Sequence, residues 1–172
     1  DILFSFGGDG TILDSVPIIR DSGIPVLGIN TGNLGFLSSV SPKETSEAVK
    51  NIITGNYEIE QRSLIQINDE KNIFGGINYA LNEVSVCRKD NGSLIVVNVF
   101  IDGMLLNTYW ADGIILATPT GSTAYSMSVG GPIMTPNADS FLITPIAAHN
   151  LSVRPVVIPN KSKVKIKVDG RC

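Results

Sequence analysis

The sequence has little histidine, little cysteine and no long apolar run. Its 172 residues include one histidine and two cysteines. With His149 as its only histidine, the chain does not favour a histidine-based zinc site, and a Ser-His-Asp triad has a single possible base. Cys87 and Cys172 lack C-x-x-C spacing, so we interpret them as reduced thiols. Apolar runs such as 94–101 are shorter than the roughly 18 residues of a membrane span, and no signal peptide is recognisable.

Charge of one sign is also scarce. There are 13 Lys and Arg against 16 Asp and Glu, which gives a net charge of −3, and no run of like charges. Nucleic acid and anionic membranes need concentrated positive charge, so we expect neither as a partner. A polyphosphate ligand would need a cation to help. The 43% hydrophobic and 17% charged residues are typical of a compact globular protein, which we expect in the cytoplasm.

The first third of the chain predicts an α/β arrangement. Residues 2–6 form a short apolar run that ends at Gly7, and residues 25–29 form a second. Apolar residues at helical spacing lie between them, so the pattern is a parallel βαβ unit. The loops that follow both strands should share the carboxyl edge of the sheet, where ligands bind in open α/β folds.

Two helices are predicted in this part. Pro17 would kink a helix that begins at Thr11, so a later start with Ser15 as the N-cap also stays open. The second helix is predicted at about 42–54, because Ser41 can cap it, a proline follows and a glutamate comes three positions on.

After Gly55 the period changes from helix to strand. Short strands are predicted at 57–60, 65–67, 82–86, 94–101, 104–110, 114–117, 141–143, 156–158 and 164–168. Many short strands separated by turn residues predict an all-β, sandwich-like domain, and Asp102-Gly103 predicts a two-residue hairpin turn. We therefore expect a partial, Rossmann-like α/β nucleotide-binding domain over 1–62 and a β-sandwich-like domain over 63–172.

A glycine-rich loop, GGDGT at residues 7–11, follows the first strand. Glycines let backbone N–H groups approach phosphate oxygens closely. Asp9 is the unusual member, because a carboxylate among phosphates is repelled unless it holds a metal or takes a proton from an attacking hydroxyl. A solvated aspartate in a turn is the alternative. The chain has no P-loop and no G-x-G-x-x-G, so a Walker ATPase or an ordinary dehydrogenase is not expected.

Two more polar stretches follow. Residues 30–36, NTGNLGF, come after the second strand and form either a second loop on the same edge or only a connection. Residues 118–128, TPTGSTAYSMS, are so dense in hydroxyls and small side chains that we do not expect them to form a core. They predict a polar turn around a sugar or amide, with a Ser/Thr-rich surface loop as the alternative.

Taken in order, these motifs resemble the NAD kinase family across nearly the whole chain. The resemblance is carried by GGDGT, NTGNLGF, Asn82-Glu83, the ADG of 111–113, and TPTGSTAYSMS followed by GGP. GGDGT also occurs in diacylglycerol and sphingosine kinases, but Asn-Glu tends to follow it almost directly there. The family implies an enzyme that phosphorylates the 2′-hydroxyl of the adenosine ribose of NAD, with ATP or polyphosphate as donor and Mg²⁺ or Mn²⁺ as cation.

The resemblance also implies roles for particular residues. Asp9 would be the catalytic aspartate that deprotonates or orients the 2′-hydroxyl, and Gly10 would lie at the diphosphate. Asn82 and Glu83 would hold adenosine and ribose groups, although a salt-bridged strand carboxylate is the alternative for Glu83. Asp112 would contact the dinucleotide. The remaining expected ligand contacts are Gly8, Thr11, Phe36, Thr120, Thr123, Ala124, Tyr125, Ser128 and Ala147; no protein ligand to a metal is assigned.

Three expectations complete the picture. Relatives form homodimers or homotetramers, so the same is expected here. The chain looks truncated at both ends relative to the family, and Ala148 stands where many relatives have a proline. A non-catalytic NAD(P) sensor and a GGDGT lipid kinase are the competing hypotheses. The NAD kinase interpretation expects Asp9 and the 118–128 segment to share one cleft.

Overall fold

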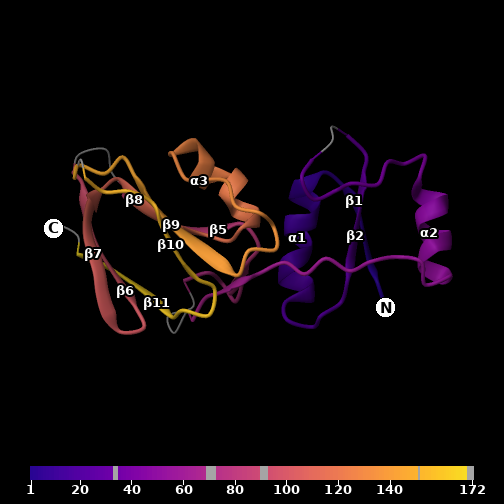
Figure 1. Cartoon of the computed structure of the whole chain (residues 1–172), viewed down its shortest axis with the longest axis horizontal. Helices are drawn as coiled ribbons and strands as arrows, with labels where there is room; N and C mark the ends of the chain where they lie inside the picture. Colours follow the sequence, from indigo (N-terminus) through magenta and orange to yellow (C-terminus); the bar gives the residue numbers. More distant parts are fainter. Residues whose placement is uncertain (33–34, 69–72, 90–92, 151, 170–172) are drawn as a thin grey trace. The chain divides into compact units, whose positions relative to one another are not determined.

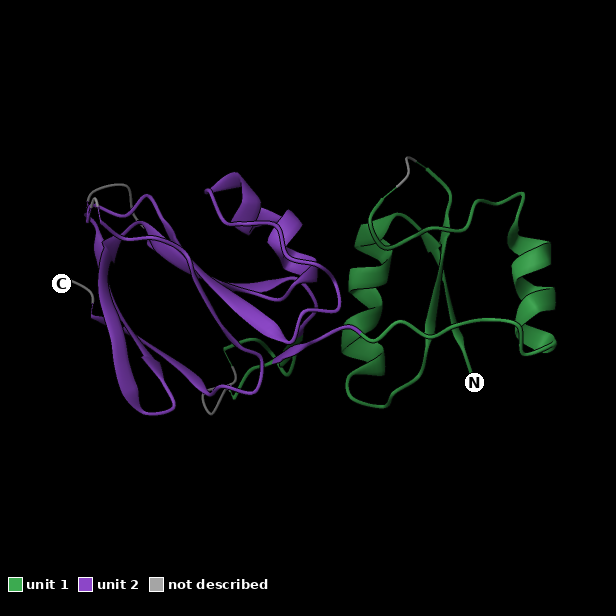
Figure 2. Cartoon of the chain, viewed as in Figure 1, with its two compact units in different colours: residues 1–61, 66–79 green, residues 62–65, 80–172 purple. Residues whose placement is uncertain are grey.

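A computed structural model of the protein describes residues 1–32, 35–68, 73–89, 93–150 and 152–169. Asn33 and Leu34 of the second glycine-rich stretch, and Cys172, lie outside these ranges. The chain divides into two compact units, which Figure 2 colours separately. Unit 1 comprises residues 1–61 and 66–79, and unit 2 comprises 62–65 and 80–172.

Unit 1 is an α/β arrangement, as the sequence predicts. Its elements are β1 (Leu3–Gly7), α1 (Asp9–Ile19), β2 (Val26–Asn30) and α2 (Thr45–Ile53). The two strands pair in parallel with Gly7 opposite Asn30, so the loops after both strands leave the same edge of the sheet. In Figure 1, α1 and α2 lie on opposite sides of this sheet.

Helix α1 begins earlier than expected. Its first residue is Asp9, so a start at Thr11 or Ser15 was wrong. Pro17 lies inside the helix, where it lacks the N–H that would donate to the Leu13 carbonyl, and the helix ends two residues later. Instead of capping, the Ser15 hydroxyl donates to the carbonyl three residues earlier at 2.6 Å.

Helix α2 begins at Thr45, three residues later than predicted. Ser41 does not cap it in the expected way. The hydroxyl and the backbone N–H of Ser41 both donate to the Glu44 carboxylate, at 2.6 and 3.0 Å. The Ser-Pro-Lys-Glu stretch therefore closes a turn that precedes the helix.

Unit 2 is a two-sheet β-sandwich. Its strands are β5 (Glu83–Cys87), β6 (Ile95–Ile101), β7 (Met104–Ala111), β8 (Gly113–Ala117), β9 (Ser140–Ile146), β10 (Val156–Pro159) and β11 (Val164–Asp169). One sheet has the order β10-β9-β8-β5 and the other β11-β6-β7. In one sheet, burial falls on single positions such as Val97 and Val99 of β6 and Tyr109 of β7, whereas every residue of β8 in the other sheet is buried. The predicted sandwich is confirmed.

The connections in unit 2 follow local chemistry. Asp102 and Gly103 join β6 to β7 with φ of 50° and 86°, the left-handed turn that the sequence predicts. A 3₁₀ turn, η1 (Thr120–Thr123), and α3 (Tyr125–Ser128) follow β8, and Figure 1 shows α3 against the β8–β9 sheet.

The short strands β3 (Ile65–Gln66) and β4 (Tyr79–Ala80) pair with each other. The strand expected at 57–60 does not form. Among the helices that the structure describes, none has the length and hydropathy needed to cross a membrane.

Candidate functional site

The Asp9 side chain is held by the segment that follows β2. Its Oδ2 accepts a hydrogen bond from the backbone N–H of Phe36 at 2.6 Å. Its Oδ1 accepts from the backbone N–H groups of Leu37 and Ser38, at 2.9 and 3.0 Å, and from the Ser38 hydroxyl at 3.3 Å. One carboxylate therefore joins the loop after β1 to the loop after β2.

Gly35 makes room for this contact. A Cβ built at Gly35 would come within 2.1 Å of Asp9 Oδ1, closer than any real side chain allows. The second loop can therefore wrap the carboxylate only because residue 35 has no side chain. Sequence analysis missed this role, since it considered a metal, a reacting hydroxyl or a solvated turn as reasons for an acidic group there, and not backbone donors of the second loop.

The hydrogen bonds also set the charge state of Asp9. Burial raises the pKa of its carboxyl, but the bonds from Leu37, Ser38 and Phe36 outweigh burial and hold the pKa below its ordinary value. Asp9 is therefore ionised at neutral pH. Each carboxylate oxygen has two lone pairs, so Oδ2, with its one bond from Phe36, keeps the capacity to accept from a ligand hydroxyl.

The remaining site residues expected in unit 1 are open to solvent. Gly10, Thr11 and Phe36 are exposed, and Gly8 precedes the first residue of α1. A Cβ built at Gly8 or Gly10 would meet nothing within 4 Å, so packing inside unit 1 does not require glycine at either position. Bare backbone at a helix N-terminus suits a phosphate group, which is the reason sequence analysis gave for these glycines.

In unit 2, the hydroxyl-rich segment is far more buried than expected. Thr118, Ser122 and Ser126 are fully buried, and Thr120 is 9% exposed. The expectation that this stretch cannot contribute to a core was wrong. The reason is that each buried hydroxyl finds a partner inside the protein, which removes the cost of burying it.

The hydroxyl groups of this segment fall into two sets. Ser122 donates to the Pro119 carbonyl at 2.6 Å and accepts from Met134 N–H at 2.9 Å, while Ser126 bonds Thr144 at 2.8 Å. These groups fold the turn. The other set comprises Thr120, which is 9% exposed, and the more accessible Thr123, Tyr125 and Ser128; these are the four hydroxyls that the family resemblance selects as ligand contacts.

Asn82 and Glu83 pack beside this turn. The Asn82 carbonyl accepts from Thr118 N–H at 2.9 Å, and a Cβ at Gly121 would come within 2.1 Å of the same oxygen. Glu83 begins β5, and its Oε2 is buried without a hydrogen-bond partner among the described residues. Burial raises the pKa of its carboxyl. An orphaned buried oxygen of this kind fits a ligand O–H or N–H donor better than the salt-bridge alternative.

Asp112 and Ala147 lie at the other end of β8. Glu83 pairs with Ala117 and Cys87 with Gly113, so the two ends are four residues, or roughly 13 Å, apart. Asp112 N–H donates to the Ile146 carbonyl at 2.9 Å, which sets it beside Ala147. The structure thus gathers the expected contacts of unit 2 into two groups rather than one.

Two arginines lie beside these groups, and sequence analysis predicted no role for either. Arg62 donates to the Thr120 hydroxyl at 3.4 Å, and Arg88 Nε lies 3.1 Å from Asp112 Oδ1. Neither has a motif around it, and only the fold brings it to the residue it contacts.

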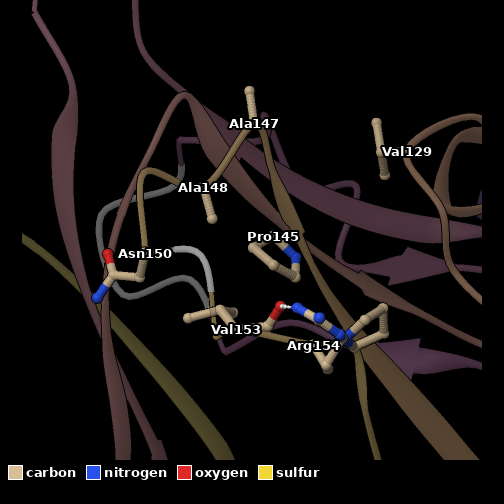
Figure 3. A pocket seen from close by; sticks show the side chains of 8 residues that line it. Val129, Pro145, Ala147, Ala148, Asn150, Val153 and Arg154 are labelled. Atoms are coloured by element: carbon tan, nitrogen blue, oxygen red, sulfur yellow. Dashed lines mark hydrogen bonds between the residues drawn. The ribbon is translucent and has the colours of Figure 1, made fainter.

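A pocket of about 300 Å³ adjoins the second group (Figure 3). Its wall includes Ala147, an expected ligand contact with a left-handed φ of 46°, and Val129, the residue after Ser128. The other lining residues are Pro145, Ala148, Asn150, Val153, Arg154 and Pro155. The end of the hydroxyl-rich segment and the segment after β9 therefore share one hollow.

The described residues offer no cage for a cation. Within those ranges, no group of three or more His, Cys, Asp and Glu side chains gathers closely enough to hold a metal ion.

Comparison with known proteins covers nearly the whole chain. Residues 1–57 match the ATP-NAD kinase N-terminal domain, and residues 81–172 match the ATP-NAD kinase C-terminal domain. The NAD kinases of Cytophaga hutchinsonii and Flavobacterium psychrophilum are 45% and 47% identical to the chain over 99% of its length. The chain spans 59% of the length of each of these curated relatives.

Two solved structures are similar in fold. A yeast NADH kinase complexed with NADH has a TM-score of 0.87 and 36% identity, covering all of this chain and 49% of that one. An Archaeoglobus fulgidus enzyme in complex with ATP has a TM-score of 0.86 and 31% identity, covering 98% of this chain and 65% of that one.

Proposed function

The chain belongs to the NAD kinase family, and from this premise we propose that the whole protein transfers a phosphoryl group from ATP, or from another phosphate donor, to the 2′-hydroxyl of the adenosine ribose of NAD. The observation that carries the proposal is the match of one chain to both domains of the family, with Asp9 present at the start of α1. The NADH and ATP bound by the two similar structures support the nature of the substrates.

Asp9 would orient the attacking hydroxyl. Its lowered pKa makes it a weak base, since a general base works best when its pKa is near the working pH. Phosphoryl transfer needs little help from a strong base, because the transition state is loose and the proton can leave late. A fixed, ionised carboxylate with a free lone pair on Oδ2 suits this role: it accepts the 2′-hydroxyl hydrogen bond and aims the oxygen at the donor.

The glycines beside Asp9 would receive phosphate oxygens. Gly8 and Gly10 have open space above them, so a diphosphate can approach the backbone N–H groups at the N-terminus of α1. Most of the rate gain would then come from positioning the two reactants and balancing charge rather than from covalent chemistry.

The dinucleotide would be recognised largely by unit 2. The Oε2 of Glu83, which has no partner within the described ranges, can accept from an adenosine or ribose group, and the accessible Thr123, Tyr125 and Ser128 supply hydroxyls beside the more buried Thr120. Ala124, Asn82, Asp112 and Ala147 complete the proposed contacts. That these residues and Asp9 serve one dinucleotide stays a prediction.

A divalent cation would arrive with the donor. The described residues form no cation cage, so we propose that Mg²⁺ or Mn²⁺ binds mainly through the donor phosphates. We also propose that the protein works in the cytoplasm, where NAD and ATP are available, and assembles as a homodimer or homotetramer.

One assay tests the proposal. The complete protein is mixed with NAD, ATP and Mg²⁺, and NADP is measured with a dehydrogenase that accepts only NADP. We expect steady NADP formation. Binding of NAD without product would support a sensor instead, and product from diacylglycerol or a sphingoid base but not from NAD would support a lipid kinase.

A further inference from the structure

Asp112 occupies a constrained point of the sandwich. It is the single residue between β7 and β8, which belong to different sheets. Its neighbours Ala111 and Gly113 are buried, and a Cβ at Gly113 would come within 2.6 Å of the Val86 carbonyl oxygen. The backbone at residue 112 therefore has little freedom to move.

Arg88 holds both the backbone and the side chain of this residue. Its N–H donates to the Asp112 carbonyl at 2.9 Å, and its guanidinium Nε lies 3.1 Å from Asp112 Oδ1. On the other side, Asp112 N–H donates to the Ile146 carbonyl at 2.9 Å. Two backbone hydrogen bonds thus fix the main chain of Asp112, and the Arg88 guanidinium holds its carboxylate through Oδ1.

The pair is accessible to a ligand. The Arg88 and Asp112 side chains are 28% and 30% exposed, and ion pairs with such exposure add little to folding. A role in binding explains the contact better than a role in stability. The guanidinium contacts Oδ1, so the lone pairs of Oδ2 remain able to accept from an O–H or N–H group.

Charge gives a second reason for the arginine. A dinucleotide carries a negative diphosphate, and an isolated carboxylate nearby would repel it. The guanidinium balances the Asp112 charge while leaving its acceptor capacity in place. A glutamine at position 88 would keep some hydrogen bonding but would remove this compensation.

We propose that Arg88 is a positioning residue for the dinucleotide: it fixes the Asp112 carboxylate and balances its charge so that Asp112 accepts from a donor group of the bound NAD. The inference rests on the proposed function, since it needs Asp112 to contact the dinucleotide. Arg88 itself touches neither the phosphate donor nor the reacting hydroxyl in this role.

The test compares Arg88→Gln, Arg88→Lys, Asp112→Asn and the double variant Arg88→Gln/Asp112→Asn in the complete protein. We expect Arg88→Gln to raise KM for NAD about tenfold while KM for ATP and kcat change less than about twofold. Arg88→Lys should recover part of the loss. In the Asp112→Asn background, Arg88→Gln should add little, because the two residues act as a unit.

A matched control removes the adjacent charge. Lys89 is exposed, and Lys89→Gln should leave KM for NAD unchanged. The inference is overturned if Arg88→Gln leaves KM for NAD unchanged, if its effect is the same with and without Asp112, or if Lys89→Gln raises KM equally. Absence of NADP formation by the unaltered protein would instead overturn the proposed function and the inference with it.

Discussion

At the scale of single residues, a few carboxylates are held in particular charge states by their neighbours. Asp9 accepts backbone hydrogen bonds from residues 36–38 and stays ionised. Glu83 has a buried oxygen that finds no partner in the part of the chain that the structure describes, and burial raises the pKa of its carboxyl. Hydrogen bonds lower the pKa of Asp9, and burial raises the pKa of Glu83. Asp9 therefore suits the role of a fixed anion, and Glu83 suits the role of an acceptor for a ligand donor.

Replacing Asp9 with asparagine should separate reaction from binding. An amide nitrogen cannot accept a hydrogen bond, so Asp9→Asn should lower NADP formation at least about a hundredfold and leave NAD affinity within about tenfold. The measurements are kcat by the coupled assay and Kd by calorimetry. Asp14→Asn, at an exposed position of the same helix, is the control and should keep its turnover. Full turnover by Asp9→Asn would rule out the proposed role.

Glu83 should make stability depend on pH. Its folded-state pKa is raised, so the stability that its proton provides is fully present below the unfolded-state pKa of about 4.3 and is lost as pH rises through the folded-state pKa. Glu83→Gln keeps a neutral group at all pH values. Its Tm should therefore exceed that of the unaltered protein by about 1–3 °C at pH 7.5.

Thermal melts from pH 4 to 8 check this expectation, and NAD affinity should fall in the same variant. The difference in Tm should shrink as the pH approaches 4. If the higher Tm of Glu83→Gln did not change with pH, the glutamine would act through packing rather than through charge.

At the scale of elements, two turns depend on glycines, because a Cβ at those positions would clash with a neighbouring segment. Gly35 admits the Asp9 carboxylate, and Gly121 lets η1 approach the Asn82 carbonyl. Burial of polar groups in these turns is tolerated because each is paired. Sequence patterns predict such turns as exposed, since the partners that permit burial come from distant strands.

The loop after β2 should fail when Gly35 gains a methyl group. In Gly35→Ala the new Cβ would meet Asp9 Oδ1, so the carboxylate must leave its N–H donors, and NADP formation should fall about 10- to 100-fold. Gly32→Ala adds the same methyl where nothing lies within 4 Å and should lose much less. Equal losses in the two variants would argue against the contact as the cause.

The turn after β8 should depend on the Thr118 hydroxyl. It donates to the Leu81 carbonyl and accepts from Gly121 N–H at 3.1 Å, and Thr118 is fully buried. Thr118→Val keeps the shape but leaves both groups unpaired, so the free energy of unfolding should drop by about 1–3 kcal/mol. Urea denaturation measures this, with the exposed Thr135→Val as the control. A change below about 0.5 kcal/mol would contradict the importance of these bonds.

At the scale of the whole molecule, the expected ligand contacts are divided between two compact units. Asp9, with the glycine-rich loops, belongs to unit 1, and the hydroxyl-rich turn with Glu83 and Asp112 belongs to unit 2. The family match runs through both. The proposed reaction therefore uses residues of both units. Its cation is proposed to bind through the phosphates of the donor.

Cation dependence tests that expectation. Chelation with EDTA should abolish NADP formation, and excess Mg²⁺ should restore it. If the donor phosphates carry the cation, as proposed, Mg²⁺ should bind the nucleotide-free protein more weakly than about 1 mM, which calorimetry can check. Tight Mg²⁺ binding without nucleotide would show that the protein supplies the ligands itself.

Much of the molecule was determined by sequence alone. The parallel βαβ unit, the sandwich and the Asp102-Gly103 turn follow from periodicity and backbone preference, which are local properties. The family also follows from motif order. Helix starts were less predictable: α1 begins at Asp9, directly after the extended backbone of Gly8, although Pro17 suggested a later start.

Only the tertiary structure decided which polar groups are used within the fold and which remain for a ligand. The sequence shows eleven residues dense in hydroxyls and small side chains, but Ser122 pairs with Pro119 and Met134, Ser126 pairs with Thr144 of β9, and Tyr125 and Ser128 stay accessible. The same holds for the partners of Asp9 and Asp112. Hydrogen bonds between distant segments depend on where strands end in space, and no local pattern encodes that.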